Sequence, residues 1–210
     1  MPIAKIPMKE QMGIRDFAYS KVTTNTREEY EAGEVKSGGW LARVSQNVTE
    51  TITPIWRDNQ KVKSKRSIPS KEIIFDVSLL PYEVRQDLLG ENVTEDGVMF
   101  GGGGVRTAPL VAVSFIMGDT EDDEEYVWFL CGTFSLPSRE ANTRNDGADS
   151  NGQELVFTPE DTLKVWSDGK THDSVSCMST NETYGQYLKT KWQEQVITPD
   201  NYRTVLVAGA

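Results

Sequence analysis

The sequence predicts a mainly β protein: a sandwich or barrel-like domain with one short flanking helix, a long loop between two strands, and arms at the termini. Three observations lead to this prediction. Apolar and polar residues alternate over several stretches of strand length, which is typical of half-buried strands. Two apolar runs rich in Val, Phe and Ile flank a short acidic turn. One stretch near the middle of the chain carries the start and stop signals of a helix.

The length of 210 residues suits one domain with arms and allows a substantial core. We expect an N-terminal arm over residues 1–13 and a β domain over 14–168. Residues 169–210 should form a C-terminal extension that packs on the domain or on a neighbouring subunit. No run of eighteen apolar residues is present, so no membrane-spanning segment is predicted. The first residues lack the apolar segment of a secretory signal, so synthesis and folding in a cytoplasm are expected.

Composition excludes several function classes. A formal net charge of −10 argues against tight binding of nucleic acid, which needs clustered Lys and Arg. Cys131, Cys177 and the single histidine, His172, are too few for a zinc site, and we expect no metal and no cofactor. In the absence of a secretory signal, free thiols are favoured over a disulfide.

The first strands follow in chain order. The alternating run from Ile14 to Thr23 predicts a first strand. Residues 41–53 and 71–80 also alternate, and these two strands should pair antiparallel. Between them, residues 54–70 are bracketed by two prolines and form the basic segment of an acidic chain, so we expect a long functional loop. Its candidate contact residues are Trp56, Arg57, Lys61, Lys63, Lys65 and Arg66.

The helix and a central hairpin come next. A helix is predicted from Pro81 to Leu89, because proline favours the start and Gly90 the end. Residues 110–117 and 126–134 are predicted to form two strands of one hairpin. Both are apolar on each face, so a helix, a second sheet or another copy must cover them. The turn between them should lie in water, because it holds six carboxylates: Asp119, Glu121, Asp122, Asp123, Glu124 and Glu125.

The remainder of the chain carries weaker signals. Residues 154–157 and 162–166 are predicted to form two short strands. Residues 184–192 fit a short helix or a strand equally well. The last nine residues, from Tyr202 onward, have the pattern of an added strand or an arm.

No group of residues selects a catalytic reaction. His172 lies beside Asp173 and Ser174, but the members of a triad come from separate elements, so an exposed loop histidine is expected. The four glycines at 101–104 lack the Lys and Ser or Thr that follow in a phosphate-binding loop. The acidic turn lacks the spaced ligands of a calcium loop. The basic loop and the acidic turn are instead complementary, and they could dock on each other across copies.

The order of these elements resembles the major tail tube protein of long-tailed phages with flexible tails. The resemblance covers residues 13–166. Its most specific parts are DVSLLPYEVRQDLLG at residues 76–90 and YVWFLCGTFSLPSREANT at residues 126–143, followed by the strand at 154–157.

The resemblance implies a structural virion protein without enzymatic activity. Six copies would form a ring, and stacked rings would form a tube that conducts the genome from capsid to host cell. The implied partners are other copies, the tape measure, the tail terminator and the baseplate or tail tip proteins; DNA would pass without specific binding. Assembly would take place in the bacterial cytoplasm. The basic loop would reach the adjacent ring, and four polar residues would line or approach the lumen: Gln46, Glu50, Glu72 and Asp76.

Other classes stay open from the residues alone. Another ring-forming virion protein, such as a tail completion or head–tail joining protein, would share the β-rich fold. A carbohydrate-binding β-sandwich module would stack sugars on Trp40, Trp56 and Trp192. A hydrolase ranks last, because no spacing selects two catalytic carboxylates.

Overall fold

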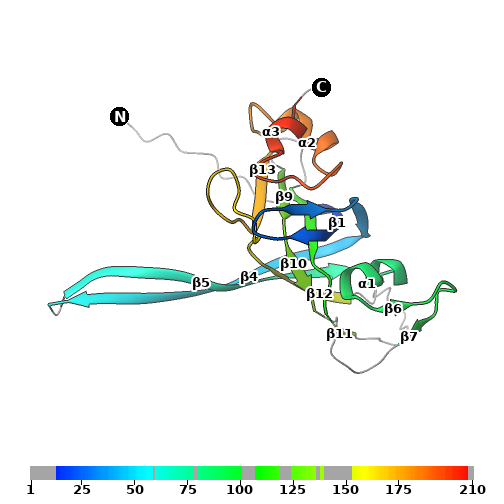
Figure 1. Ribbon diagram of the computed structural model, residues 1–210, viewed down its shortest axis with the longest axis horizontal. Coiled ribbons are helices and arrows are strands. Elements are labelled where there is room, and N and C mark those ends of the chain that lie inside the picture. Colours follow the sequence, from blue (N-terminus) through cyan, green and yellow to red (C-terminus); the bar gives the residue numbers. More distant parts are fainter. Residues whose placement is uncertain are drawn as a thin grey trace.

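The computed structural model describes residues 13–58, 60–77, 80–100, 107–118, 124–135, 138–139 and 153–207. Within these residues, two antiparallel sheets pack face to face, three short helices lie at the periphery, and a long two-stranded ribbon projects from the body (Figure 1). The prediction of a mainly β, sandwich-like fold is therefore confirmed. The single predicted helix is joined by two more near the C-terminus.

The first sheet has the strand order β13-β9-β8-β1-β2. On the side of β1 that faces away from β8, β3 pairs with the first half of β1 and β2 with the second half. All of its pairs are antiparallel. The predicted first strand is confirmed as β1. The strands of this sheet are β1 (Ile14–Asn25), β2 (Tyr30–Ala32), β3 (Lys36–Gly39), β8 (Val111–Met117), β9 (Glu125–Phe129) and β13 (Ser174–Met178).

The second sheet has the order β10-β12-β5-β4, with β11 also paired to β12. The pair of β4 with β5 is the predicted antiparallel pair, since Val44 lies opposite Phe75 and Gln46 opposite Ile73. A separate two-stranded sheet joins β6 (Asn92–Val93) to β7 (Met99–Phe100). The strands of the second sheet are β4 (Leu41–Arg57), β5 (Gln60–Val77), β10 (Gly132–Phe134), β11 (Ser138–Arg139) and β12 (Gln153–Pro159).

The core between the two sheets is built around Phe75. Its side chain has no exposed surface. Its ring centroid lies 5.2 Å from that of Phe17 and 5.6 Å from that of Phe115, both in the first sheet. Phe134, in the second sheet, lies 6.0 Å away. These offset and edge-on ring contacts join the inner faces of the sandwich.

The predicted central hairpin is only partly right. β8 and β9 pair as expected, but residues 126–134 are not one strand: β9 ends at Phe129 and β10 joins the second sheet. The chain changes sheets beside Gly132, where a Cβ atom would lie 2.4 Å from a ring atom of Phe157. Glycine therefore allows the close approach of β10 to β12.

This close approach predicts a stability effect. Gly132→Ala is expected to lower the free energy of unfolding by about 1–3 kcal/mol, because the new methyl group also meets the backbone oxygen of Thr158 at 2.5 Å. Urea unfolding followed by tryptophan fluorescence measures the loss. Gly33→Ala is the matched control, since its Cβ would make an ordinary contact at 3.5 Å. Equal midpoints for the two variants would contradict the prediction.

The outer face of the β8–β9 pair is covered by the C-terminal part of the same chain. Trp128 and Leu130 pack there with Leu188 of α2 (Gly185–Lys191) and with Trp192, and these residues form a second core. The indole N–H of Trp128 donates to the carbonyl of Trp192 at 2.9 Å. The helices α2 and α3 (Tyr202–Val205) lie together at one end of the molecule (Figure 1). The C-terminal residues thus supply the cover that the two-faced apolar pattern requires.

Two sequence-based predictions near the C-terminus are wrong. Residues 162–166 are irregular, with a bend at 163–164, rather than a strand, and the segment from Tyr202 begins with a helical turn rather than an added strand. Both segments instead bury a large apolar side chain in the second core, Trp166 from the first and Leu206 from the second. The ambiguous segment at 184–192 is helical.

The helix α1 (Tyr82–Leu89) is confirmed at its predicted place. It follows Pro81 and ends at Gly90, whose φ of 64° is readily adopted by glycine. Its buried carboxylate, Asp87, accepts a hydrogen bond from the Tyr19 hydroxyl at 3.1 Å and pairs with Lys21 and Lys36. Burial opposes ionisation of Asp87, but these partners outweigh it, and the pKa of Asp87 lies below its ordinary value. The network ties α1 to the first sheet.

The lowered pKa of Asp87 predicts a pH-dependent contribution. The carboxylate stabilises the fold fully above its unfolded pKa of about 3.9, and this contribution is lost as the pH falls through the lower folded pKa. Asp87→Asn should therefore cost about 1–2 kcal/mol at neutral pH and less in acid. Urea midpoints of both proteins at neutral pH and near pH 3 test this. A deficit of equal size at both pH values would exclude the ionised form as the cause.

Candidate assembly surfaces

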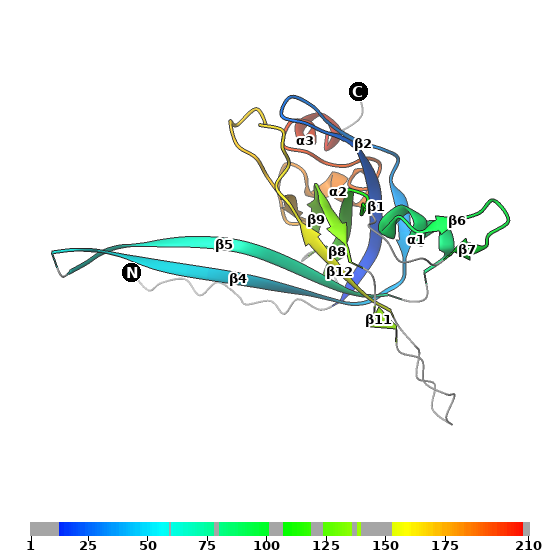
Figure 2. The ribbon, with the colours of Figure 1, turned by 60° about the horizontal axis from the view of Figure 1, so that its bottom comes forward.

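The basic segment at residues 54–70 is not a loop, which corrects the prediction. β4 and β5 continue beyond the second sheet as a ladder that extends to the pair Arg57 and Gln60, and the ribbon projects far from the body (Figure 2). Pro69 falls in a bulge, between the pairs that Thr49 and Thr51 make, where a missing N–H is tolerated. The prolines therefore do not end the strands.

The ribbon exposes apolar and basic residues together. Trp56 is 61% exposed and Val62 is 63% exposed, and Ile52 and Ile55 are also exposed. Arg57 and Lys63 are exposed beside them, while Lys61, Lys65 and Arg66 occupy further ladder positions. An isolated two-stranded ribbon is marginally stable in water. Exposed apolar side chains on such a ribbon indicate a surface that another protein covers.

The acidic turn is only partly covered by the structure. Asp119, Glu121, Asp122 and Asp123 lie outside the described residues. Glu124 is buried, pairs with Arg15, and accepts a hydrogen bond from the Tyr126 hydroxyl at 2.6 Å. Burial opposes its ionisation, but Arg15 and Tyr126 together hold its pKa below the ordinary value. Glu124 thus supports the local fold, and Glu125 is the half-buried first residue of β9.

The four candidate lumen residues do not share one face of the second sheet. Ile73, Phe75 and Val77 of β5 point into the core, so Glu72 and Asp76 lie on the opposite, outer face. Gln46 lies opposite Ile73 in the ladder and therefore belongs to the inner face, on an exposed part of β4. Glu50 falls at the bulge after Thr49.

Further polar residues accompany Glu72 and Asp76 on the outer face. Asp76 lies between Arg43 of β4 and Glu154 of β12, and Asn47 lies opposite Glu72. Arg43, Asn47 and Glu154 are exposed. Sequence reasoning missed Glu154 as a member of this surface, because a single strand does not reveal its neighbours. Its alternation with the buried Leu155 was the available signal.

The two edges of the second sheet are different. β4 forms one edge, and β10 and β11 form the other; in the described ranges no further strand covers either edge. Unpaired edges are natural sites for pairing with another chain. Because the edges are unlike, copies that join through them do so head to tail.

The residues considered for catalysis are held apart. The Nε2 atom of His172 lies 2.7 Å from Oδ2 of Asp168, whereas Asp173 pairs with Lys71 and accepts a hydrogen bond from the Ser174 hydroxyl. In the part of the chain that the structure describes, no three His, Cys, Asp or Glu side chains are grouped to hold a metal. His172 thus lies in an irregular segment before β13 and is partly exposed, in line with the expected loop position.

Both cysteines are free thiols. Burial raises the pKa of the Cys131 thiol to about 11, and burial also raises that of Cys177. Cys131 therefore remains protonated in the core near neutral pH.

Two of the three tryptophans considered for sugar stacking are exposed. Trp40 is 84% exposed and Trp56 is 61% exposed, but Trp192 is buried in the second core. The prediction of an exposed Trp192 is wrong, because the indole fills the space between α2 and the first sheet. No shared aromatic platform of the three exists.

A projecting apolar and basic ribbon, a polar sheet face and two open sheet edges describe a protein that works by contacting other proteins. None of the helices in the described ranges is long and apolar enough to cross a membrane. The sequence matches the family described as phage tail tube protein over residues 30–197, well over half of the chain. The chain therefore belongs to the phage tail tube protein family, and it is a structural component of the virion tail. No curated protein matched the sequence.

Proposed function

We propose that copies of this chain form hexameric rings, and that the rings stack into a hollow tube through which the genome passes from capsid to host cell. The observation that carries the proposal is the ribbon. It extends from an acidic body, exposes Trp56 and Val62 to solvent, and carries most of its charge as Lys and Arg. Such an element gains stability when another subunit covers it.

The proposed ring uses the second sheet. Its unlike edges, β4 on one side and β10 with β11 on the other, suit a head-to-tail contact that closes on itself. Joined in this way, six copies of the sheet would make one continuous wall. The outer face with Glu72, Asp76 and Glu154 would then turn toward the lumen. Carboxylates there would repel DNA phosphates and let the genome slide without binding.

The proposed stack uses the ribbon. From Thr49 to Arg57, nine residues at about 3.3 Å each give a reach of roughly 30 Å. That length is enough to cross from one subunit onto a neighbour in the next ring. The acidic turn, with Asp119 and Asp122, is the candidate partner for the basic residues. The further proposed partners of the tube are the tape measure, tail terminator and tail tip proteins. Assembly would take place in the host cytoplasm.

Negative-stain electron microscopy of the purified full chain tests the proposal. Stacked rings or tubes with a central hole, in the concentrated protein or after addition of tail tip complexes, are the expected result. Rings that never stack under either condition would favour a tail completion or head–tail joining role. Monomers alone under both conditions would contradict the proposal.

A further inference from the structure

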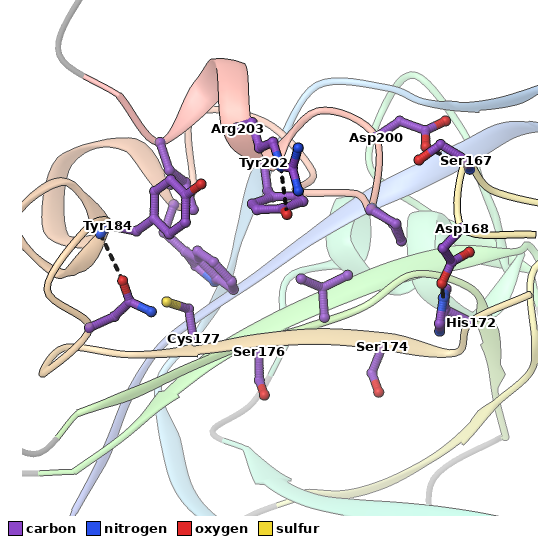
Figure 3. Close-up of a pocket in the computed structure, with 15 residues that line it drawn as sticks. Ser167, Asp168, His172, Ser174, Ser176, Cys177, Tyr184, Asp200, Tyr202 and Arg203 are labelled. Carbon is purple, nitrogen blue, oxygen red and sulfur yellow. Dashed lines mark hydrogen bonds and ion pairs between the residues drawn. The ribbon is translucent and has the colours of Figure 1, made fainter. Parts of the chain in front are cut away.

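A groove of about 780 Å³ lies between β13 and the C-terminal helices. Four consecutive residues of β13, from Ser174 to Cys177, line it. Since their side chains alternate between the two faces of the strand, the groove follows the outer edge of β13. Figure 3 shows Ser174 and Ser176 on one side of the strand and Cys177 on the other, below Tyr184 and Tyr202.

The edge of β13 along this groove has unpaired backbone groups. β13 is the last strand of the first sheet, and among the described strands it pairs with β9 alone. The N–H of Leu130 donates to Asp173, and that of Ser179 donates to Glu124, so the odd-numbered residues bond toward β9. Ser174 and Ser176 therefore direct their N–H and C=O groups outward. In the described part of the chain these groups have no backbone partner.

A buried side chain also lacks a partner in this groove. Trp192 is 1% exposed and lines the groove, and its indole N–H makes no hydrogen bond with the described residues. A buried N–H without an acceptor is costly. An incoming backbone carbonyl would supply that acceptor. Tyr184 and Tyr202 stand over the same space with ring centroids 5.6 Å apart, and they provide an apolar wall.

We propose that this groove binds the N-terminal segment of a neighbouring copy, residues 1–12, as an added strand on β13. The inference rests on the self-assembly of the proposed function and names a second contact within it. The segment reads MPIAKIPMKEQM, and the four residues between its prolines, IAKI, can pair without interruption. Bonding to both Ser174 and Ser176 needs about three residues of an added strand.

The pattern of the segment also fits the groove. Ala4 and Ile6 fall on one face of an extended strand, and Ile3 and Lys5 fall on the other. The apolar pair would face Tyr184, Tyr202 and Trp192, whereas Lys5 would remain in water with the serines.

The segment that binds the groove should come from a neighbouring copy, because the linker within one copy is too short to reach its own groove. The N–H of Gly118 donates to Gly13, so the segment leaves at the end of the sheet where Met178 lies. An added strand beside β13 is four strand spacings, about 19 Å, from β1. Residues 7–12 span about 20 Å when fully extended, which leaves no slack for the two turns that the path requires. The segment of another copy has no such limit.

Disulfide trapping tests the proposal with the native thiol of Cys177. One full-length chain carries Ile6→Cys and Cys177→Ser, and a second, differently tagged, keeps Ile6 and Cys177. In a mixture treated with oxidised glutathione, the thiols of positions 6 and 177 join as a disulfide while glutathione is reduced. We expect linked pairs of the two tags. A chain with Lys5→Cys in place of Ile6→Cys should give about tenfold fewer linked pairs, because the side chain at position 5 faces away from Cys177.

A backbone variant tests strand addition itself. Ser176→Pro removes the outward N–H, which the fold does not use, whereas Ser176→Ala keeps it. Ser176→Pro should lower the yield of linked pairs about tenfold relative to Ser176→Ala. Circular dichroism checks that both variants are folded. Equal yields would overturn strand addition.

The outcomes separate this inference from the proposed function. If tubes form but no linked pairs appear, the proposed groove contact is wrong and the proposed tube function still stands. Linked pairs without rings or tubes would support the groove contact and contradict the tube. A single chain with Ile6→Cys and native Cys177 that closes an internal disulfide, while the mixture gives no linked pairs, would assign the segment to its own groove and overturn the proposal.

Discussion

Replacing Lys61, Lys63, Lys65 and Arg66 together with Glu is expected to abolish stacking while each subunit stays folded. Residues 54–70 of the ribbon carry five basic residues and one acidic residue, Asp58, so their four net positive charges face fourteen net negative charges in the rest of the chain. Reversal changes attraction into repulsion at every contact with an acidic neighbour. Juxtaposed like charges at an interface cost several kcal/mol, enough to raise the assembly concentration roughly a hundredfold or more.

Sedimentation and electron microscopy at increasing protein concentration measure this effect. The matched control exchanges charge type only, with Arg at positions 61, 63 and 65 and Lys at 66. That variant should still form tubes, although at a somewhat higher concentration, because Lys and Arg hydrogen-bond differently. Tubes of normal length from the Glu variant would remove the ribbon charges from the assembly mechanism.

Phe75→Ala is expected to cause the largest loss of subunit stability. The ring is fully buried and contacts aromatic rings from both sheets, so truncation leaves a cavity at the centre of the sandwich. Such substitutions cost about 3–5 kcal/mol, out of a total of about 5–15 kcal/mol for a typical domain. The melting temperature should fall by roughly 6–20 °C.

Thermal unfolding by circular dichroism measures this loss. Val62→Ala is the control, because that side chain is 63% exposed on the ribbon and should change subunit stability very little. A melting temperature of Phe75→Ala close to that of the control would show that the rings around Phe75 contribute less than their burial implies.

Local pattern predicted the strands and the helix, because alternation and helix-end signals are short-range. β1 and α1 are found where the sequence placed them, and the pairing of β4 with β5 is found as well. The extent of that pairing was missed. From the sequence alone, Pro54 and Pro69 predict breaks in the strands, yet in a two-stranded ribbon an outward N–H or a bulge accommodates proline.

Long-range features were harder to predict from the sequence. Both faces of β8 were expected to be covered, but the identity of the cover depended on residues such as Leu188 and Trp192, which lie in a polar, weakly patterned region. The change of sheet at Gly132 follows from a contact with Phe157, twenty-five residues away. The groove on β13 was missed because an unpaired edge is a property of the sheet order and leaves no mark on the strand itself.

The unlike edges of the second sheet have a genetic consequence under the proposed ring. A subunit with one damaged edge still offers its intact edge, so it enters a growing arc and stops closure. Such a subunit therefore prevents wild-type subunits in the same cell from forming closed rings. In a ring of six, one damaged subunit in ten leaves only roughly half of the rings free of it. Edge mutations should therefore behave as dominant negatives, whereas mutations that unfold the whole subunit should be recessive.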